Sequence, residues 1–202
     1  MKFLLTLLLI LAQFFLFADI LPKDTASQSN FGFSIGAESA RIIGHGPSMF
    51  AVGIVPPSIG INANLLYSNK LSQKRWGKEY SVGFSQRGYT IDQKTYIENL
   101  SLDYLNMGIN IHKNYSDHSS VHFGGYLSYL LKATYELGES PTYQVESNYK
   151  PIDIGLNASY SYRFYKNMGL RLSQNIGVLP LDRGNTILEL NNSTVLSIVL
   201  NL

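Results

Sequence analysis

Three histidines, His112, His118 and His122, lie in or close to one short polar segment, residues 114–119. If a tight turn joins the two flanking segments, the three imidazoles come close together, and imidazole nitrogen is a common ligand of Zn²⁺. Histidines at strand ends and in turns are also often simply solvated, and we favour that interpretation here. We therefore predict no metal site and no cofactor.

A second set of residues has the composition of a nucleophilic site. His45 and Ser48 share a segment rich in Gly and Pro, residues 44–57, and Glu38 is the nearest acid. Nucleophilic catalysis requires a hydroxyl, a base beside it and a group that orients the base. A Gly/Pro-rich loop that happens to contain both residues explains the pattern equally well. We predict no catalytic residues and no enzyme activity.

The elements that would position these residues are long two-faced strands. In residues 121–136 the odd positions are apolar or Gly for eight successive places, while the even positions are mainly small or polar. Successive side chains of a strand point to opposite faces, and ordinary strands contain only about 5–6 residues. A tilted strand of about 15 residues is long enough to cross the ~25 Å apolar band of an outer-membrane barrel.

The same alternation recurs in seven further segments, so that eight strands are predicted: 31–41, 59–68, 80–87, 100–111, 121–136, 152–164, 168–178 and 196–202. In the fourth, the apolar positions change from even to odd near Tyr104 and Leu105. Such a phase change indicates a β-bulge. Alternatively, residues 100–104 lie outside the membrane, where facing matters less.

The connections between these strands differ in length. Those after the first, fifth and seventh strands are long, and those after the fourth and sixth are short, although the ten-residue connector 69–78 does not fit this pattern. Alternating short turns and long loops, with an even number of strands, are typical of transmembrane β-barrels. We therefore predict an all-β fold, an eight-stranded antiparallel up-and-down transmembrane β-barrel.

Composition and the N-terminus agree with an exported membrane protein. Residues 1–18 have the positive start, apolar run and small final residue of a signal peptide. A polar linker, 19–30, and the barrel, 31–202, follow. Only 15% of the 202 residues are charged, there is no Cys, and the net charge of +2 argues against nucleic-acid binding. The predicted location is the outer membrane, with its lipid as a partner.

The apolar face of each strand is predicted to meet lipid. Its aromatic residues Phe31, Tyr67, Tyr80, Phe123 and Phe164 fall at one end of the strands, as in an interfacial girdle. The charged side chains of the other face would then line the interior: Glu38, Arg87, Lys132, Glu136, Asp153, Arg163 and Arg171. We expect Asp153 and Glu38 to pair with Arg163 and Arg171, with Asp153 bound to Arg171. The alternative is a soluble, lipocalin-like carrier whose apolar face points inward.

Three segments resemble the PorT-like family of small outer-membrane β-barrel proteins from Bacteroidota. They are SQRGY at 85–89, LDYLNMGI at 102–109 and GGYLSYLL at 124–131. Asn106 and Gly108 stand where that family usually has Glu and Pro, which makes the chain a divergent member. The resemblance implies the fold and the location, but it does not imply an activity.

The function that these observations favour is that of a non-enzymatic outer-membrane barrel. It would be structural or would bind a protein partner or ligand through its outer loops, residues 41–57, 138–150 and 180–192, as part of an envelope or secretion assembly. The alternatives are an outer-leaflet lipid-modifying enzyme and the soluble carrier.

Overall fold

The computed structural model describes residues 29–45, 58–70, 75–93, 96–138, 141–179 and 188–202. These residues form nine strands and one 3₁₀ helix: β1 (Ser29–His45), β2 (Ser58–Lys70), β3 (Trp76–Gln93), β4 (Tyr96–Asn114), β5 (Ser119–Leu137), β6 (Tyr143–Gln144), η1 (Glu146–Asn148), β7 (Ile152–Arg163), β8 (Met168–Gly177) and β9 (Leu188–Asn201). Within these ranges, no helix is long and apolar enough to span a membrane. The predicted signal peptide, 1–18, lies outside the described residues.

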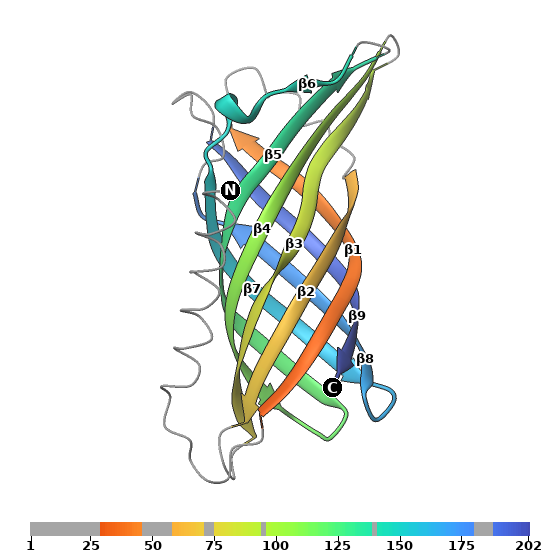
Figure 1. Ribbon diagram of the computed structural model, residues 1–202, viewed down its shortest axis with the longest axis vertical. Helices are drawn as coiled ribbons and strands as arrows, with labels where there is room; N and C mark the ends of the chain where they lie inside the picture. Colours follow the sequence, from red (N-terminus) through yellow and green to blue (C-terminus); the bar gives the residue numbers. More distant parts are fainter. Residues whose placement is uncertain (1–28, 46–57, 71–74, 94–95, 139–140, 180–187) are drawn as a thin grey trace, which may run out of the picture.

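Eight of the strands close into a barrel (Figure 1). Each pairs antiparallel with the next along the chain, and β1 pairs with β9 from Gly32↔Asn201 to His45↔Leu188. The two-residue β6 adds only to the edge of β5, through Thr134 and Tyr135. The predicted eight-stranded antiparallel up-and-down barrel is confirmed.

The two ends of the barrel differ. One end, the turn end, holds the short connections 115–118 and 164–167 and the C-terminus. At the opposite, loop end, β3, β4 and β5 rise above the other strands (Figure 1), because they contain 18, 19 and 19 residues whereas β7 and β8 contain 12 and 10. We call residues 86–93, 96–104 and 130–137 the loop-end sheet.

The connector between β2 and β3 is shorter than expected. Asn69 pairs with Lys78 and Lys70 with Gly77, so the ladder takes in both ends of the segment 69–78 that the sequence analysis assigned to a connector. The alternation is hard to recognise there because the outward and inward positions are both polar. The connection is therefore a short one at the turn end, and the exception to the barrel pattern disappears.

The apolar face of the strands points outward. Leu156 is 63% exposed and Ile59 is 79% exposed, although both are large and hydrophobic. The opposite positions are small or polar and buried, as at Ser34, Asn62 and Ser197. A soluble carrier would need an apolar interior along the whole barrel, and this structure contradicts that alternative.

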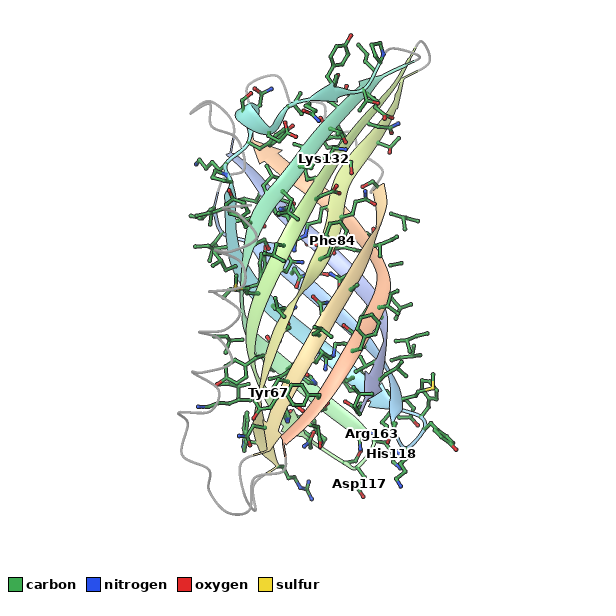
Figure 2. All side chains as sticks on the ribbon, in the orientation of Figure 1. Tyr67, Phe84, Asp117, His118, Lys132 and Arg163 are labelled. Carbon is green, nitrogen blue, oxygen red and sulfur yellow. The ribbon has the colours of Figure 1, made fainter. Side chains whose placement is uncertain are left out.

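The predicted aromatic girdle lies at the turn end of this outward face. Phe31 and Tyr67 have ring centroids 5.1 Å apart, and those of Tyr67 and Tyr80 are 6.2 Å apart (Tyr67 is labelled in Figure 2). Phe123 and Phe164 are 61% and 51% exposed. Aromatic rings of this kind mark the level of a membrane interface.

The predicted β-bulge is present, but its extra residue belongs to the neighbouring strand. Asp103 of β4 pairs with Lys132 of β5, while the next residue, Tyr104, pairs with Leu130. Leu131 therefore has no partner across the pair, and β4 keeps one alternation along its whole length. The sequence located the irregularity correctly and assigned it to the wrong strand.

Because β4 keeps its phase, its apolar even residues point into the barrel near the loop end. There they form a buried apolar cluster (Leu100, Leu102, Tyr104, Leu130 and Ala133), against which Tyr89, Val145 and Tyr149 pack. The bulge in β5 also turns Ala133 inward and leaves Lys132 and Glu136 exposed. The sequence analysis predicted one continuous apolar face over residues 121–136. The structure instead shows that the inward and outward positions exchange at Leu131.

Candidate functional site in the barrel interior

A buried ion cluster spans the barrel interior from three strands. Arg87 of β3 donates from Nε to Glu38 Oε1 of β1 at 2.8 Å and from Nη1 to Asp153 Oδ2 of β7 at 3.0 Å. All three side chains are at least 97% buried. We call Glu38, Arg87 and Asp153 the Arg87 cluster. A buried charge is tolerated where ion pairs and hydrogen bonds replace its hydration.

Neutral side chains complete the coordination of the Arg87 cluster. Asn62 Nδ2 and Ser193 Oγ donate to Glu38 at 2.8 and 2.6 Å. Tyr126 OH and Asn191 Nδ2 donate to Asp153 Oδ2 at 3.2 and 2.9 Å. The rings of Tyr104 and Tyr126 each lie 5.2 Å from the Arg87 guanidinium carbon, within cation–π range.

The interior is closed on the loop-end side and hollow on the turn-end side. The apolar cluster lies beyond the Arg87 cluster, toward the loop end. Tyr104 belongs to the apolar cluster, and its ring contacts Arg87. On the other side lie a small cavity of about 80 Å³, which Arg87 lines, and a larger one of about 260 Å³ at the turn end. Arg171 borders both cavities. We call the larger one the mouth cavity.

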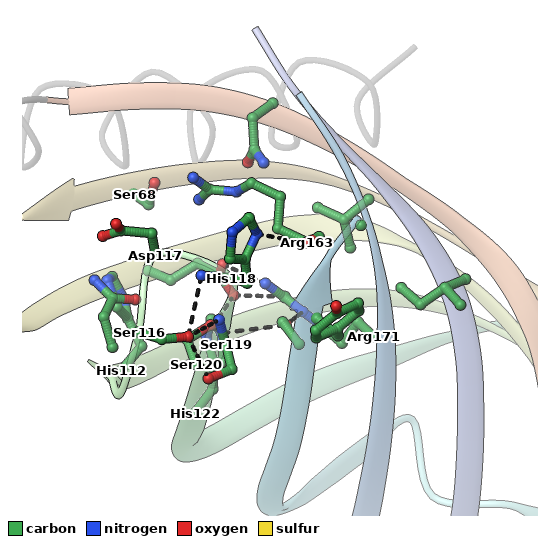
Figure 3. Close-up of a pocket in the computed structure, with 18 of the residues that line it drawn as sticks. Ser68, His112, Ser116, Asp117, His118, Ser119, Ser120, His122, Arg163 and Arg171 are labelled. Atoms are coloured by element: carbon green, nitrogen blue, oxygen red, sulfur yellow. Dashed lines mark hydrogen bonds and ion pairs between the residues drawn. The ribbon is translucent and has the colours of Figure 1, made fainter. Parts of the chain in front are cut away.

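A second buried ion pair forms the inner wall of the mouth cavity (Figure 3). Arg171 of β8 binds Glu79 of β3 through two parallel bonds, Nη1 to Oε1 at 2.7 Å and Nη2 to Oε2 at 2.8 Å. Its Nε donates to Ser161 Oγ of β7 at 2.8 Å. This bidentate geometry fixes both side chains more firmly than a single contact would.

His122 of β5 links this ion pair to two hydroxyl groups. Its Nε2 lies 3.0 Å from Ser120 Oγ and 3.3 Å from Ser161 Oγ, and its Nδ1 lies 3.6 Å from Glu79 Oε1. His122 is only 4% exposed, and its ring centroid is 5.2 Å from that of His112. Gly77 permits this packing, because a Cβ at that position would overlap the His112 ring.

The ion pairs differ from those expected from the sequence. The predicted pairing of Asp153 with Arg171 is wrong, since Asp153 binds Arg87 and Arg171 binds Glu79. Arg163, expected to serve the same network, is exposed at the rim of the mouth cavity. The sequence does not show which strands face each other across the lumen, because that depends on the stagger of the whole barrel.

Sequence reasoning missed Glu79. The third strand was taken to begin at Tyr80 and the connector to end at residue 78, so Glu79 was assigned to neither. Glu79 has an odd number, like Ser81, Ser85 and Arg87 of the same strand, and this shared phase could have identified it as an inward residue.

The three histidines separate into two kinds. His118 is exposed in the turn, where its Nδ1 lies 3.1 Å from the carbonyl oxygen of Arg163 (Figure 2). His112 and His122 are buried, so the interpretation of all three as solvated is wrong for these two. Across the described ranges, no group of three or more His, Cys, Asp or Glu side chains is arranged to hold a metal ion.

Of the outer set His45, Ser48 and Glu38, the structure describes the side chain of Glu38. Glu38 points into the interior, where both its oxygens are bound. His45 is the last residue of β1, and Ser48 lies outside the described residues. Glu38 is therefore engaged elsewhere and is not placed to orient a base at the loop end.

Residues 17–183 match the family model described as an outer membrane protein beta-barrel domain. The chain belongs to this family. The location that this supports is the outer membrane, and the short connections of such barrels face the periplasm whereas the long ones face outward. In this outer-membrane barrel, the turn end is thus periplasmic and the loop end is the outer end.

Solved structures of other small barrels share the fold. Neisserial surface protein A (NspA) is 12% identical, with a TM-score of 0.56 over 86% of this chain and 98% of that one. Ail, the attachment invasion locus protein of Yersinia pestis, is also 12% identical, with a TM-score of 0.50 over 87% of this chain and 99% of its own. No curated protein sequence matches the chain. These likenesses support the fold and nothing finer.

Proposed function

We propose that this outer-membrane barrel acts by binding a protein partner or ligand at its outer end, as part of an envelope or secretion assembly, and not by catalysis there. The observation that carries the proposal is the combination of an interior that is filled toward the outer end and a projecting loop-end sheet. The Arg87 cluster and the apolar cluster fill the interior toward the outer end. This arrangement favours a role for the surface over a role for the lumen.

The loop-end sheet is suited to such a role. Several of its outward side chains are polar: Gln86 Nε2 donates to Ser101 Oγ and Asp103 Oδ1 at 3.2 and 3.3 Å, and Lys132, which pairs with Asp103, is exposed. The apolar cluster supports it from within. A rigid, water-exposed sheet beyond the membrane is a surface on which recognition can be built.

We further propose that the chain is a divergent PorT-like protein from Bacteroidota. The SQRGY segment places Ser85 and Arg87 on the inward face of β3, and GGYLSYLL places Tyr126, Ser128 and Leu130 inward on β5. These segments supply part of the Arg87 cluster and its neighbours. The resemblance therefore falls on residues with a structural reason to be retained.

The test is a crosslinking pull-down from intact envelopes, comparing Lys132→Glu with Lys166→Glu. Both lysines are exposed, but Lys132 lies on the loop-end sheet and Lys166 in a periplasmic turn. We expect Lys132→Glu to reduce recovery of a specific partner and Lys166→Glu to leave it unchanged. Equal effects of both changes would contradict recognition by the loop-end sheet.

The competing function, an outer-leaflet lipid-modifying enzyme, has its own measurement. Lipid A and phospholipid profiles of a deletion strain should remain unaltered. A change in those lipids that His45→Ala or Ser48→Ala reproduces would replace the binding role with the enzymatic one.

A further inference from the structure

The mouth cavity contains a serine, a histidine and a carboxylate in a catalytic order. Ser120 and His122 are inward residues of β5, two positions apart, and Glu79 reaches them from β3. Ser120 Oγ is 3.0 Å from His122 Nε2, and His122 Nδ1 is 3.6 Å from Glu79 Oε1. A nucleophile in contact with a base that a third group orients is the general signature of a covalent catalyst.

The arrangement gives each group a distinct role. An acid beside Nδ1 favours the tautomer that carries its proton there and leaves Nε2 free to accept the serine proton. The distance to Glu79 exceeds that of a hydrogen bond, but such contacts often tighten only when substrate is bound. Because Arg171 holds both oxygens of Glu79 at 2.7 and 2.8 Å, the carboxylate is fixed in position.

Ser120 is better suited than Ser161 to be the nucleophile. It is the closer of the two to His122 Nε2, at 3.0 Å against 3.3 Å. Ser161 Oγ also accepts a hydrogen bond from Arg171 Nε at 2.8 Å, which occupies a lone pair and lowers the nucleophilicity of its oxygen. The two serines pair across β5 and β7, so the position of a covalent adduct distinguishes them.

The cavity limits the substrate to a small polar molecule. Its volume is about 260 Å³, below the 300–1,000 Å³ usual for drug-sized ligands. Hydroxyl and amide side chains make up about half of its wall, among them Ser68, Asn114 and Asn201. The exposed Asp117 and Arg163 also line it (Figure 3). A short polar ester matches this volume and this polar wall better than an ester with a long acyl chain.

We propose that Ser120 is an activated nucleophile and that this site hydrolyses a small polar carboxylic ester from the periplasm. Ser120 Oγ bonds to the ester carbon while its proton passes to His122 Nε2, and the departing alcohol takes that proton as the ester C–O bond breaks. Water then attacks the acyl-serine, its proton returns through His122, and a carboxylic acid leaves. This activity is additional to the proposed binding role, which excludes catalysis at the outer end and not at the periplasmic end.

The experiment uses the protein purified from outer membranes in detergent. A fluorophosphonate probe is added to folded and heat-unfolded samples, the modified residue is located by peptide mass spectrometry, and hydrolysis of p-nitrophenyl acetate is followed in parallel. The wild-type protein should carry one adduct, on Ser120, in the folded sample only. Heat-modifiable gel mobility verifies that each variant is folded.

The variants separate catalysis from a merely structural hydrogen bond. Ser120→Ala should abolish labelling, and His122→Gln should slow it by about 10²–10⁴-fold, the usual contribution of a general base. Ser161→Ala should keep the adduct on Ser120, although its rate should change because the substitution removes contacts to His122 and Arg171. Absence of an adduct in the folded wild type, or labelling that persists in Ser120→Ala, would overturn the proposal without affecting the binding role. The wild-type adduct decides the matter even if a variant fails to fold.

Discussion

The barrel below the bulge and the loop-end sheet above it point their apolar side chains in opposite directions: outward below the bulge and inward above it. Below the bulge, β4 points Leu105 toward lipid and Asn106 into the interior. Above it, the same strand points Asp103 outward and Leu102 inward, without any change in its alternation. The level of the bulge is therefore where the polarity of the surroundings reverses.

This difference shows that the medium outside determines what the interior must be. In lipid, apolar side chains can face outward at little cost, and the interior holds the polar groups that pair with one another. In water, folding requires buried apolar surface, and the loop-end sheet obtains it from the apolar cluster. A phase change in the hydrophobic pattern of one strand thus marks a boundary of the membrane.

The largest effect is expected at the Arg87 cluster. Arg87→Met leaves the carboxylates of Glu38 and Asp153 buried without a countercharge, and should lower the free energy of unfolding by about 3–5 kcal/mol. Urea titration of the protein refolded into lipid vesicles measures it. Lys132→Met, at an exposed cation, is the control and should change stability by less than about 0.5 kcal/mol.

The next effect compares two leucines on either side of the bulge. Leu102→Ala opens a cavity in the apolar cluster and should cost about 2–5 kcal/mol. Leu105→Ala, on the lipid face, loses contact with fluid acyl chains that refill the space, so its cost should be smaller. Equal losses in the same urea titrations would show that the loop-end sheet has no packed core of its own.

A pair of arginine substitutions tests the outward faces. Leu156→Arg introduces a charge into the lipid-facing surface and should cost about 2–4 kcal/mol near the bilayer midplane. Ser101→Arg, outward on the loop-end sheet, enters water and should be nearly neutral. If Ser101→Arg were as costly as Leu156→Arg, lipid would extend above the bulge and the comparison would fail.

The smallest effect is the coupling between charges in the mouth cavity. A double-mutant cycle on Glu79 and Arg171 should give an interaction energy of about 0.5–3 kcal/mol, because their side chains are in direct bidentate contact. The same cycle on Asp153 and Arg171 should give little coupling, since each has another partner. Strong coupling in the second cycle would restore the pairing expected from the sequence.

Much of the architecture was predictable because it repeats along the chain. Eight alternating segments predicted the strands, and the girdle residues Phe31, Tyr67 and Phe123 indicated one edge of the membrane. The residues of the mouth cavity were harder to predict from the sequence. Ser120 and Ser161 carried no distinguishing pattern, and the histidines that the sequence singled out were taken for solvated residues, although His122 is buried beside Glu79.

The sequence by itself determined the strand number and the level of the bulge, because both depend on a local alternation of side chains. The outward direction of the apolar face followed from its aromatic girdle and from the charges on the opposite face. Only the tertiary structure decided which charges meet in the lumen. Arg87 lies 49 positions from Glu38 and 66 positions from Asp153 in the chain, and Arg171 lies 92 positions from Glu79. These partners depend on how the strands stagger as the sheet closes, which no single strand records.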